Sequence, residues 1–381
     1  MALLLILLGT FGYLQFESRQ PVTLLAPTGS YPVGRAIYDW TDRSRVDPFS
    51  PGASQARELS VWAWYPAQVG REARRAAYLP PGWQHAFQGT DFLHTRADVV
   101  TTHSWSGTPL ARTRSPLPVL VFMPGFGRIA ANYTTLAEDL ASRGYAVFAV
   151  NPTYVSDDVV LDRGRVVPAN PTVAEEDAGG NAFDPRDPID ARVTEVEAAD
   201  LRFALDRATS LDRSIGDRFS GRLDVSRVGF FGHSIGGSAA TRACQLEARC
   251  AGAANLDGAV FGPVVEHGMG KPYLFLGEDP SLSPVPKAEL HGVVQGLPAD
   301  RDRVLTVTGA GHMNFSDSGV LYKFPPHQLG AIGSIDGARA LTIARAYLRA
   351  FFDVHVRGQS SSLLAAPSPP YPDVHPVPGF A

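Results

Sequence analysis

Cysteine is almost absent from this sequence of 381 residues, which contains only Cys244 and Cys250. Two cysteines exclude a disulfide framework and a cysteine-rich zinc site. Their close spacing allows one bridge across a short turn, which would fit an oxidising compartment. Two unpaired buried thiols are an equally consistent interpretation, so the sequence leaves the pairing open.

Charge is also sparse. Charged residues make up 19% of the chain, and 34 basic against 38 acidic residues leave a formal net charge of −4. The sequence has no basic run, which argues against a nucleic-acid-binding protein. Hydrophobic residues make up 44%, as is typical of a globular protein with a sizeable core. We find no internal repeat or linker, and expect one domain over residues 21–364.

The two ends of the chain differ in composition from this domain. The apolar run Ala2–Leu14 would form a helix about 20 Å long, short of the hydrocarbon core of about 30 Å. It lacks a basic start and a small-residue cleavage site. We interpret residues 1–20 as a signal or membrane-anchor remnant, which favours membrane association and an extracytoplasmic location; a buried helix is the alternative. Residues 365–381 are proline-rich and predict an extended strap over the surface.

Between the ends, short β-branched runs alternate with helical patterns, which indicates an α/β fold with a mostly parallel sheet. Asn132 is expected to cap the first helix and Gly144 to end it. The predicted strands are Leu59–Tyr65, Val119–Met123, Tyr145–Val150, Val228–Phe231, Ala251–Leu256, Tyr273–Leu276 and Val304–Val307. The predicted helices are Asn132–Arg143, Arg192–Leu205, a small-residue helix from Ser234, and Asp336–Phe352.

Two long stretches, Ala67–Ser115 and Thr153–Ile189, fit no regular element and are rich in glycine and proline. Loops of this length are usually functional or mobile. The second contains Val159–Pro168, which reads as a small hairpin. The first carries several apolar residues, namely Tyr78, Leu79, Trp83, Phe87, Phe92 and Leu93. Both stretches are expected to flank a site at the carboxyl ends of the strands.

The most specific motif is Gly232-His233-Ser234-Ile235-Gly236-Gly237, which follows a predicted strand and opens a predicted helix. It matches the G-x-S-x-G nucleophile elbow, in which a sharp turn holds serine at its tip. Side chains at Gly232 and Gly236 would collide with neighbouring backbone, and the serine is expected in a strained conformation. A plain glycine-rich turn is the alternative, but the flanking strand and helix favour Ser234 as a nucleophile.

A serine nucleophile needs a base, normally a histidine that an acid holds in place. His312 is the predicted base, because it lies on a glycine-rich loop directly after the strand Val304–Val307. His233 is interpreted as packing beneath the elbow. The other downstream histidines that we interpret as structural are His291, His327, His355 and His375.

Two residues are candidates for the acid. Asp257 follows the strand Ala251–Leu256, and Asp279 follows Tyr273–Leu276, which is the more usual position in hydrolases. Either strand end could reach the histidine loop, so spacing alone does not decide between them. Acyl transfer also needs backbone donors for the oxyanion, and we predict the N–H groups of Phe126 and Ile235 for this role.

Taken together, these residues resemble the plasma-type, calcium-independent platelet-activating-factor acetylhydrolases and their bacterial relatives. The resemblance covers about nine-tenths of the chain. It is carried by Gly29–Gly34 (G-x-Y-x-V-G), by Trp64-Tyr65-Pro66, by the G-H-S-x-G-G elbow, by Leu256-Asp257-Gly258 and by His312–Asp317. In that family the acid is the aspartate of the L-D turn, so the resemblance implies Asp257. This chain departs from the family's H-G-x-G oxyanion loop, because Pro124 replaces the histidine.

We therefore expect a serine carboxylic-ester hydrolase of the α/β-hydrolase fold, with helices on both faces of the sheet. Ser234, His312 and Asp257 would form its triad, and no metal or organic cofactor is required. The resemblance implies short-chain acyl esters, on a small molecule or a lipid, as substrates. The alternatives are a polyester or cutinase-like hydrolase with Asp279 as the acid, and a non-catalytic binding protein on the same fold.

Overall fold

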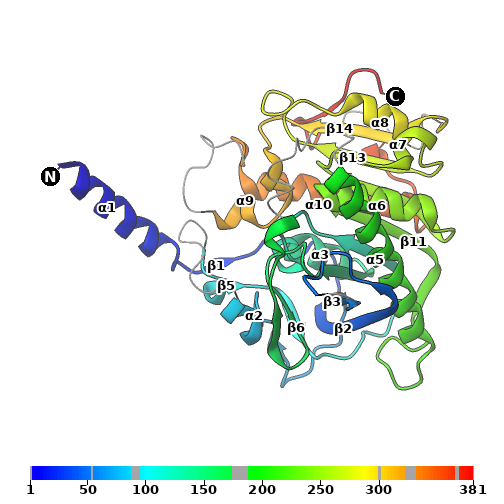
Figure 1. Ribbon diagram of the computed structural model, residues 1–381. Coiled ribbons are helices and arrows are strands. Elements are labelled where there is room, and N and C mark those ends of the chain that lie inside the picture. The colour runs from blue at the N-terminus through cyan, green and yellow to red at the C-terminus, as the bar shows by residue number, and fades with distance from the viewer. Residues whose placement is uncertain are drawn as a thin grey trace.

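The computed structural model describes residues 2–52, 55–86, 95–173, 188–298, 302–322, 332–364 and 369–380. Its centre is a large mixed sheet that passes through the whole body (Figure 1). From one edge to the other the strands are β15 (Val374–Pro376), β14 (Asp302–Val307), β13 (Tyr273–Gly277), β12 (Cys250–Leu256), β11 (Leu223–His233), β7 (Leu117–Met123), β8 (Ala146–Pro152), β3 (Ala56–Pro66), β2 (Val33–Val46), β6 (Ser104–Ser106) and β4 (Arg74–Arg75). Every predicted strand overlaps one of these.

The strands that matter for function form the parallel part of this sheet. All neighbours from β14 to β8 run parallel. By contrast, β3 pairs antiparallel with β8 and β2, and β15 pairs antiparallel with β14. Because parallel strands end at the same edge, the residues that follow β7, β11, β12, β13 and β14 gather on one side of the molecule.

Helices cover both faces of the sheet, as the sequence predicts. The helices α3 (Thr134–Ser142) and α10 (Gly337–His355) pack on one face, and α5 (Pro188–Arg213) and α6 (Ile235–Leu246) pack on the other. Side chains of β7 alternate between the two cores: Leu120 and Phe122 lie with α3 and α10, whereas Val119 and Val121 lie with α5 and α6. This period of two is what a strand covered on both faces requires.

One predicted helix start is wrong. The chain forms a 3₁₀ turn at Ala130–Tyr133, and α3 begins after it at Thr134. Asn132 does not cap α3, because its side-chain oxygen turns back and accepts a hydrogen bond from the Ile129 N–H at 3.0 Å. The predicted end is confirmed: Gly144 follows α3 with φ of +94°, a conformation that glycine adopts without strain.

The two irregular stretches contain more structure than their composition suggests. Val159–Leu161 (β9) and Arg165–Val167 (β10) form the predicted hairpin. The first stretch contributes β4 and β6 to the sheet, together with the short helix α2 (Pro81–Ala86). In α2 the buried Trp83 ring meets Trp62 edge-to-face with 5.1 Å between centroids, so this stretch closes one side of the core. Phe87, Phe92 and Leu93 lie outside the described residues.

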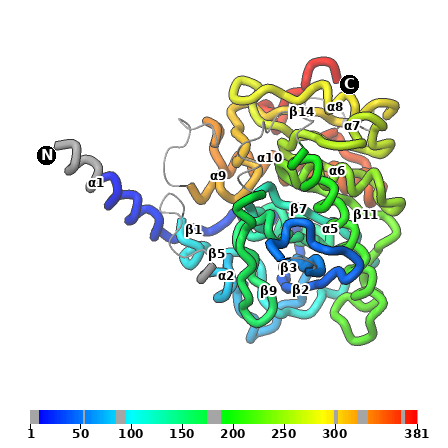
Figure 2. Tube along the Cα trace, in the orientation of Figure 1, coloured from blue at the N-terminus to red at the C-terminus, as the bar shows by residue number. Residues whose placement is uncertain are grey.

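The two ends of the chain behave differently. The N-terminal helix α1 (Ala2–Glu17) extends away from the body (Figure 1), and only its last turns approach it, with Leu14 buried. Among the helices in the described ranges, none has the length and apolar character needed to cross a membrane. The C-terminal segment runs along the surface beside α8 (Lys287–Val294), as the tube in Figure 2 shows, and adds β15 to the sheet edge. It is thus a strap, as its proline content predicts.

Cys244 and Cys250 form a disulfide, so the bridged one of the two interpretations is correct. The bond ties the last turns of α6 to the first residue of β12. It closes the connection between the helix that follows the elbow and the strand that leads to Asp257.

A buried ion-pair network fixes α5 against the sheet. The Arg57 guanidinium on β3 contacts Asp47 at 2.8 Å and Asp200 of α5 at 2.7 Å, and all three side chains are at most 1% exposed. The two carboxylates compensate the buried cation, and Arg57 also donates to the Thr153 carbonyl. Removing one member of such a network leaves uncompensated buried charge.

We therefore expect Arg57→Met to lower the free energy of unfolding by about 3–5 kcal/mol, because Asp47 would remain buried without its cation and Asp200 would keep only the partly exposed Arg45, 2.8 Å away. Chemical denaturation followed by circular dichroism measures this change. Arg96→Met is the matched control, since the pair of Arg96 with Asp98 is solvent-exposed and should cost less than about 1 kcal/mol. Equal losses in the two variants would contradict the interpretation.

Candidate active site

The elbow has the geometry that its glycines predict. β11 ends at His233 and α6 begins at Ile235, so Ser234 alone makes the turn, with φ of 56° and ψ of −134°. Left-handed φ is costly for a residue with a side chain. A Cβ atom on Gly232 would lie 2.0 Å from the Gly236 carbonyl oxygen, and one on Gly236 would lie 2.1 Å from the Pro124 oxygen. Only glycine fits at either position.

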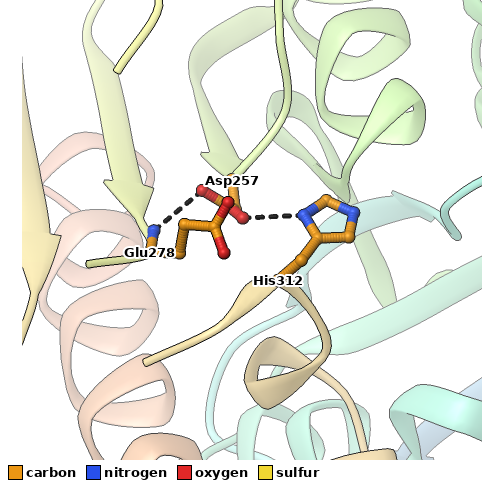
Figure 3. A group of neighbouring side chains, drawn as sticks. All are labelled: Asp257, Glu278 and His312. Atoms are coloured by element: carbon orange, nitrogen blue, oxygen red, sulfur yellow. Dashed lines mark hydrogen bonds and ion pairs between the residues drawn. The ribbon is translucent and has the colours of Figure 1, made fainter. Parts of the chain in front are cut away.

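The structure places Asp257 against His312. Asp257 follows β12, His312 lies on the loop after β14, and the His312 Nδ1 and Asp257 Oδ2 atoms are 2.7 Å apart (Figure 3). The other carboxyl oxygen of Asp257 accepts the Glu278 backbone N–H at 2.8 Å. Asp257 is also in the left-handed region, with φ of 55°.

Asp279, the alternative acid, has a different role. Its Oδ2 atom accepts the Gly309 N–H at 2.6 Å, and its Oδ1 atom accepts the Ser281 N–H at 2.8 Å. Gly309 lies on the loop that leads to His312, so Asp279 stabilises this loop through a backbone hydrogen bond. These contacts disfavour the polyester-hydrolase alternative, which needs Asp279 on the imidazole.

The environment of His312 favours the protonated form of its ring. Because a carboxylate can only accept, Nδ1 carries the proton of the neutral ring and Nε2 keeps a free lone pair. Burial works to lower the pKa of His312, but the hydrogen bond and charge of Asp257, with the charge of Glu278, raise that pKa above 6.5. Such an imidazole accepts a proton readily and holds the resulting charge.

His233 packs beneath the elbow, as predicted, and it also belongs to a hydrogen-bonded chain. Its Nε2 atom lies 2.9 Å from the His312 carbonyl oxygen and its Nδ1 atom 2.8 Å from the Tyr133 hydroxyl. Burial, and then the charge of His312, lowers the pKa of His233, so the ring is neutral. A carbonyl can only accept, so Nε2–H donates to it, and the Tyr133 hydroxyl must donate to Nδ1.

Tyr133 extends this chain to the loop after β7. Its oxygen accepts the Gly125 N–H at 3.2 Å, so the Tyr133 hydroxyl connects the loop that carries Phe126 to His233, and through His233 to the His312 carbonyl. The sequence analysis missed Tyr133. The sequence placed Tyr133 inside the predicted helix Asn132–Arg143, whereas α3 begins at Thr134, the residue after Tyr133.

The two predicted oxyanion donors come from neighbouring residues in space. A Cβ atom on Gly125 would lie 3.1 Å from the Ser234 Cβ atom, so the loop after β7 touches the elbow. Phe126 is half-buried against an apolar cluster that includes Ile235, Val155 and Val193. Ile235 is the first residue of α6, where backbone N–H groups lack helical partners. The site therefore has an apolar wall beside its backbone donors.

Two of the histidines that the sequence assigns to structural roles pack against aromatic rings. The His291 ring stacks on Phe380 at 4.1 Å, and His355 contacts Phe351 at 4.7 Å between centroids. His375 lies in β15 at the sheet edge. His327 lies outside the described residues.

Glu278 is a site residue that the sequence analysis did not consider. Asp257, Glu278 and His312 each offer an atom able to ligate a metal, and these atoms all lie within 4.8 Å of one another (Figure 3). Two members of this group, Asp257 and His312, share a hydrogen bond in the structure. The prediction that the site works without a metal stays a prediction.

Comparisons with known proteins agree with this geometry. Residues 207–361, which include Ser234, Asp257 and His312, match the family described as platelet-activating factor acetylhydrolase, isoform II. A probable 1-alkyl-2-acetylglycerophosphocholine esterase of Arthroderma benhamiae is 25% identical over 91% of this chain and 92% of its own length. A ferulic acid esterase from Streptomyces cinnamoneus is 34% identical over 94% of this chain and 100% of its own, with a TM-score of 0.78.

The fold and these relatives define the class of protein: it is a carboxylic ester hydrolase with the α/β-hydrolase fold. Its substrates are carboxylic esters. More narrowly, the part of the chain that carries the elbow, Asp257 and His312 matches the platelet-activating factor acetylhydrolase isoform II family, which its motifs also resemble.

We expect Tyr133→Phe to lower kcat by about tenfold with KM nearly unchanged, because a buried His233 nitrogen and the Gly125 N–H lose their partner and the two loops shift. Steady-state kinetics on a p-nitrophenyl ester measures the effect. Tyr145→Phe is the control, since it removes a hydroxyl bonded to Asp353 at the opposite end of β8. A comparable loss of kcat in both variants would indicate general destabilisation instead.

Proposed function

We propose that Ser234, His312 and Asp257 are the catalytic triad of this ester hydrolase. The observation that carries the proposal is the 2.7 Å contact between His312 Nδ1 and Asp257 Oδ2, in a site where Ser234 is held at a strained elbow. Ser234 Oγ attacks the ester carbonyl, and His312 Nε2 takes its proton. Asp257 keeps the imidazole in the required tautomer and stabilises its cationic form.

The second half of the reaction uses the same groups. The tetrahedral oxyanion accepts hydrogen bonds from the N–H groups of Phe126 and Ile235. When the tetrahedral intermediate collapses, His312 gives the proton to the departing alcohol. The acyl group stays bonded to Ser234 Oγ. His312 then takes a proton from water, whose oxygen attacks the acyl carbon; when the bond to Ser234 Oγ breaks, His312 returns that proton to Oγ and the carboxylic acid is released.

The substrates in this proposal are esters with short acyl chains, on a small molecule or a lipid. The name of the Arthroderma relative, an acetylglycerophosphocholine esterase, supports an acetyl-like group on a lipid alcohol. The apolar cluster beside the oxyanion donors, with Phe126 half-buried against it, supports a confined acyl site. The contacts of Asp279 with Gly309 and Ser281 give no support to the polyester alternative.

Ser234→Ala is expected to lower kcat for p-nitrophenyl acetate by more than about 10⁴-fold, because the acyl-enzyme cannot form. Asp257→Asn should lower it by at least about 100-fold through loss of the correct tautomer. Asp279→Asn, the matched control, should stay within about fivefold of the native rate, because an amide oxygen can still accept from Gly309. Full activity in Ser234→Ala would refute the triad, and inactivity of Asp279→Asn alone would exchange the acids.

Attachment of α1 to a lipid surface outside the cytoplasm is the second part of the proposal. Residues 2–16 contain no charged side chain, and Phe11, Tyr13 and Phe16 are at least half exposed on a helix that extends from the body. Exposed aromatic and aliphatic groups gain free energy at the interface between headgroups and acyl chains. The Cys244–Cys250 disulfide supports an oxidising compartment.

Co-sedimentation with neutral phosphatidylcholine vesicles tests this attachment. The double variant Phe11→Ser/Phe16→Ser should reduce the bound fraction at least about tenfold, since two large apolar groups no longer enter the interface. The control is Val46→Ser/Ile215→Ser, which removes exposed apolar groups from the body. Binding that is equal in all three proteins, or absent from the native one, would exclude the proposed role of α1.

A further inference from the structure

We infer that Glu278 is a second carboxylate for His312, which shares with Asp257 the stabilisation of the imidazolium and can replace it in part. This inference rests on the proposed triad. It assigns to Glu278 the role of positioning and stabilising the His312 ring. Glu278 directly precedes Asp279, which holds the position that the acid more usually takes in hydrolases.

The sheet brings the two carboxylates together. β12 and β13 are adjacent and parallel, with Leu256 opposite Leu276, so Asp257 and the residues after Gly277 leave the sheet at the same edge. The Glu278 N–H donates to Asp257 Oδ1 at 2.8 Å, which fixes the backbone of one acid to the side chain of the other. The side chains of consecutive residues point in different directions here, so Asp279 accepts the Gly309 N–H and does not face His312.

The Glu278 side chain turns back toward the histidine. Figure 3 shows its carboxyl group beside that of Asp257, on the side where His312 approaches. Its nearest ligand atom lies within 4.8 Å of both the Asp257 oxygen and a His312 nitrogen. A small rotation of the imidazole or the glutamate therefore suffices to form a direct contact, which is the condition for partial replacement of Asp257.

The charges around Glu278 set when it acts. Burial, and then the negative charge of Asp257, raises the pKa of Glu278 to about 7, while His312 and the Ser283 hydroxyl work against this rise. Arg128, on the loop after β7, opposes protonation of His312. The Gly309 and Ser281 N–H groups, with a smaller contribution from the charge of His375, lower the pKa of Asp279. Glu278 thus changes charge near neutral pH, beside a histidine whose pKa its own charge raises.

The chemical consequence appears when Ser234 is deprotonated. His312 then carries a positive charge next to the neighbouring carboxyl groups of Asp257 and Glu278, and an ionised Glu278 stabilises that charge. No proton needs to reach Glu278, because the proton stays on Nε2 until the alcohol leaves. The three groups titrate as a coupled set, so the pH profile belongs to the set and not to one residue.

Glu278→Gln, which keeps size and hydrogen-bonding capacity, tests the charge. Activity appears as His312 loses its proton, and the Glu278 charge raises the His312 pKa. Removing that charge should move the acid limb of the kcat/KM profile to lower pH by about half a unit to one unit, with kcat at pH 8 reduced about two- to tenfold. The matched control Glu266→Gln, on the exposed end of α7 (Pro263–His267), should leave the limb in place.

Replacement of Asp257 gives the second test. Glu278→Gln should lower kcat by at least about tenfold more in an Asp257→Ala background than in the native enzyme, because groups that act together are not additive. Active-site titration with an organophosphonate, located on Ser234 by mass spectrometry, counts the folded enzyme in every variant. This count separates loss of catalysis from loss of protein.

An unmoved acid limb in Glu278→Gln, together with additive losses in the double variant, would overturn the inference. That result leaves the triad intact if Ser234 is still labelled and Ser234→Ala is inactive. Conversely, full activity of Ser234→Ala would remove the triad itself. The two failures therefore give different results.

Discussion

The close approach of backbone at Gly232 and Gly236 is the constraint from which the site is built. It forces the chain to reverse at Ser234, and it lets the start of α6 sit against the Pro124 carbonyl of the neighbouring loop. A similar contact occurs on the other side, where a Cβ atom on Gly258 would lie 2.0 Å from the Ser234 carbonyl oxygen. The loops after β7, β11 and β12 therefore meet around one serine because none of them carries a side chain at the contact.

Two histidines that are adjacent in space have pKa values shifted in opposite directions. The rings of His233 and His312 are 4.5 Å apart. Burial dominates at His233, whose pKa falls, and the neutral ring becomes a structural link between Tyr133 and the His312 carbonyl. At His312 the carboxylates outweigh burial and the pKa rises. The proposed base thus rests on a neighbour that cannot compete for the proton.

Local signals in the sequence predicted most of the fold, and fewer of the contacts. The parallel strands and the elbow follow from β-branched runs and glycine positions, which act over a few residues. The choice between Asp257 and Asp279 did not follow from spacing, because both end a strand; the family resemblance implied Asp257, and the structure places it on His312. Asn132 was wrong as a cap because its side chain closes the preceding turn. Tyr133 was missed because its partner, His233, is 100 residues away.

The Cys244–Cys250 disulfide joins the two elements that lead to Ser234 and Asp257. α6 starts beside Ser234 and ends at the bridge, and β12 starts at the bridge and ends beside Asp257. The helix α6 and the strand β12 are therefore linked covalently at one end. Their other ends carry the proposed nucleophile and the proposed acid. A thiol reductant would break this link away from the ends that carry Ser234 and Asp257. The distance between these two residues would then vary over a wider range.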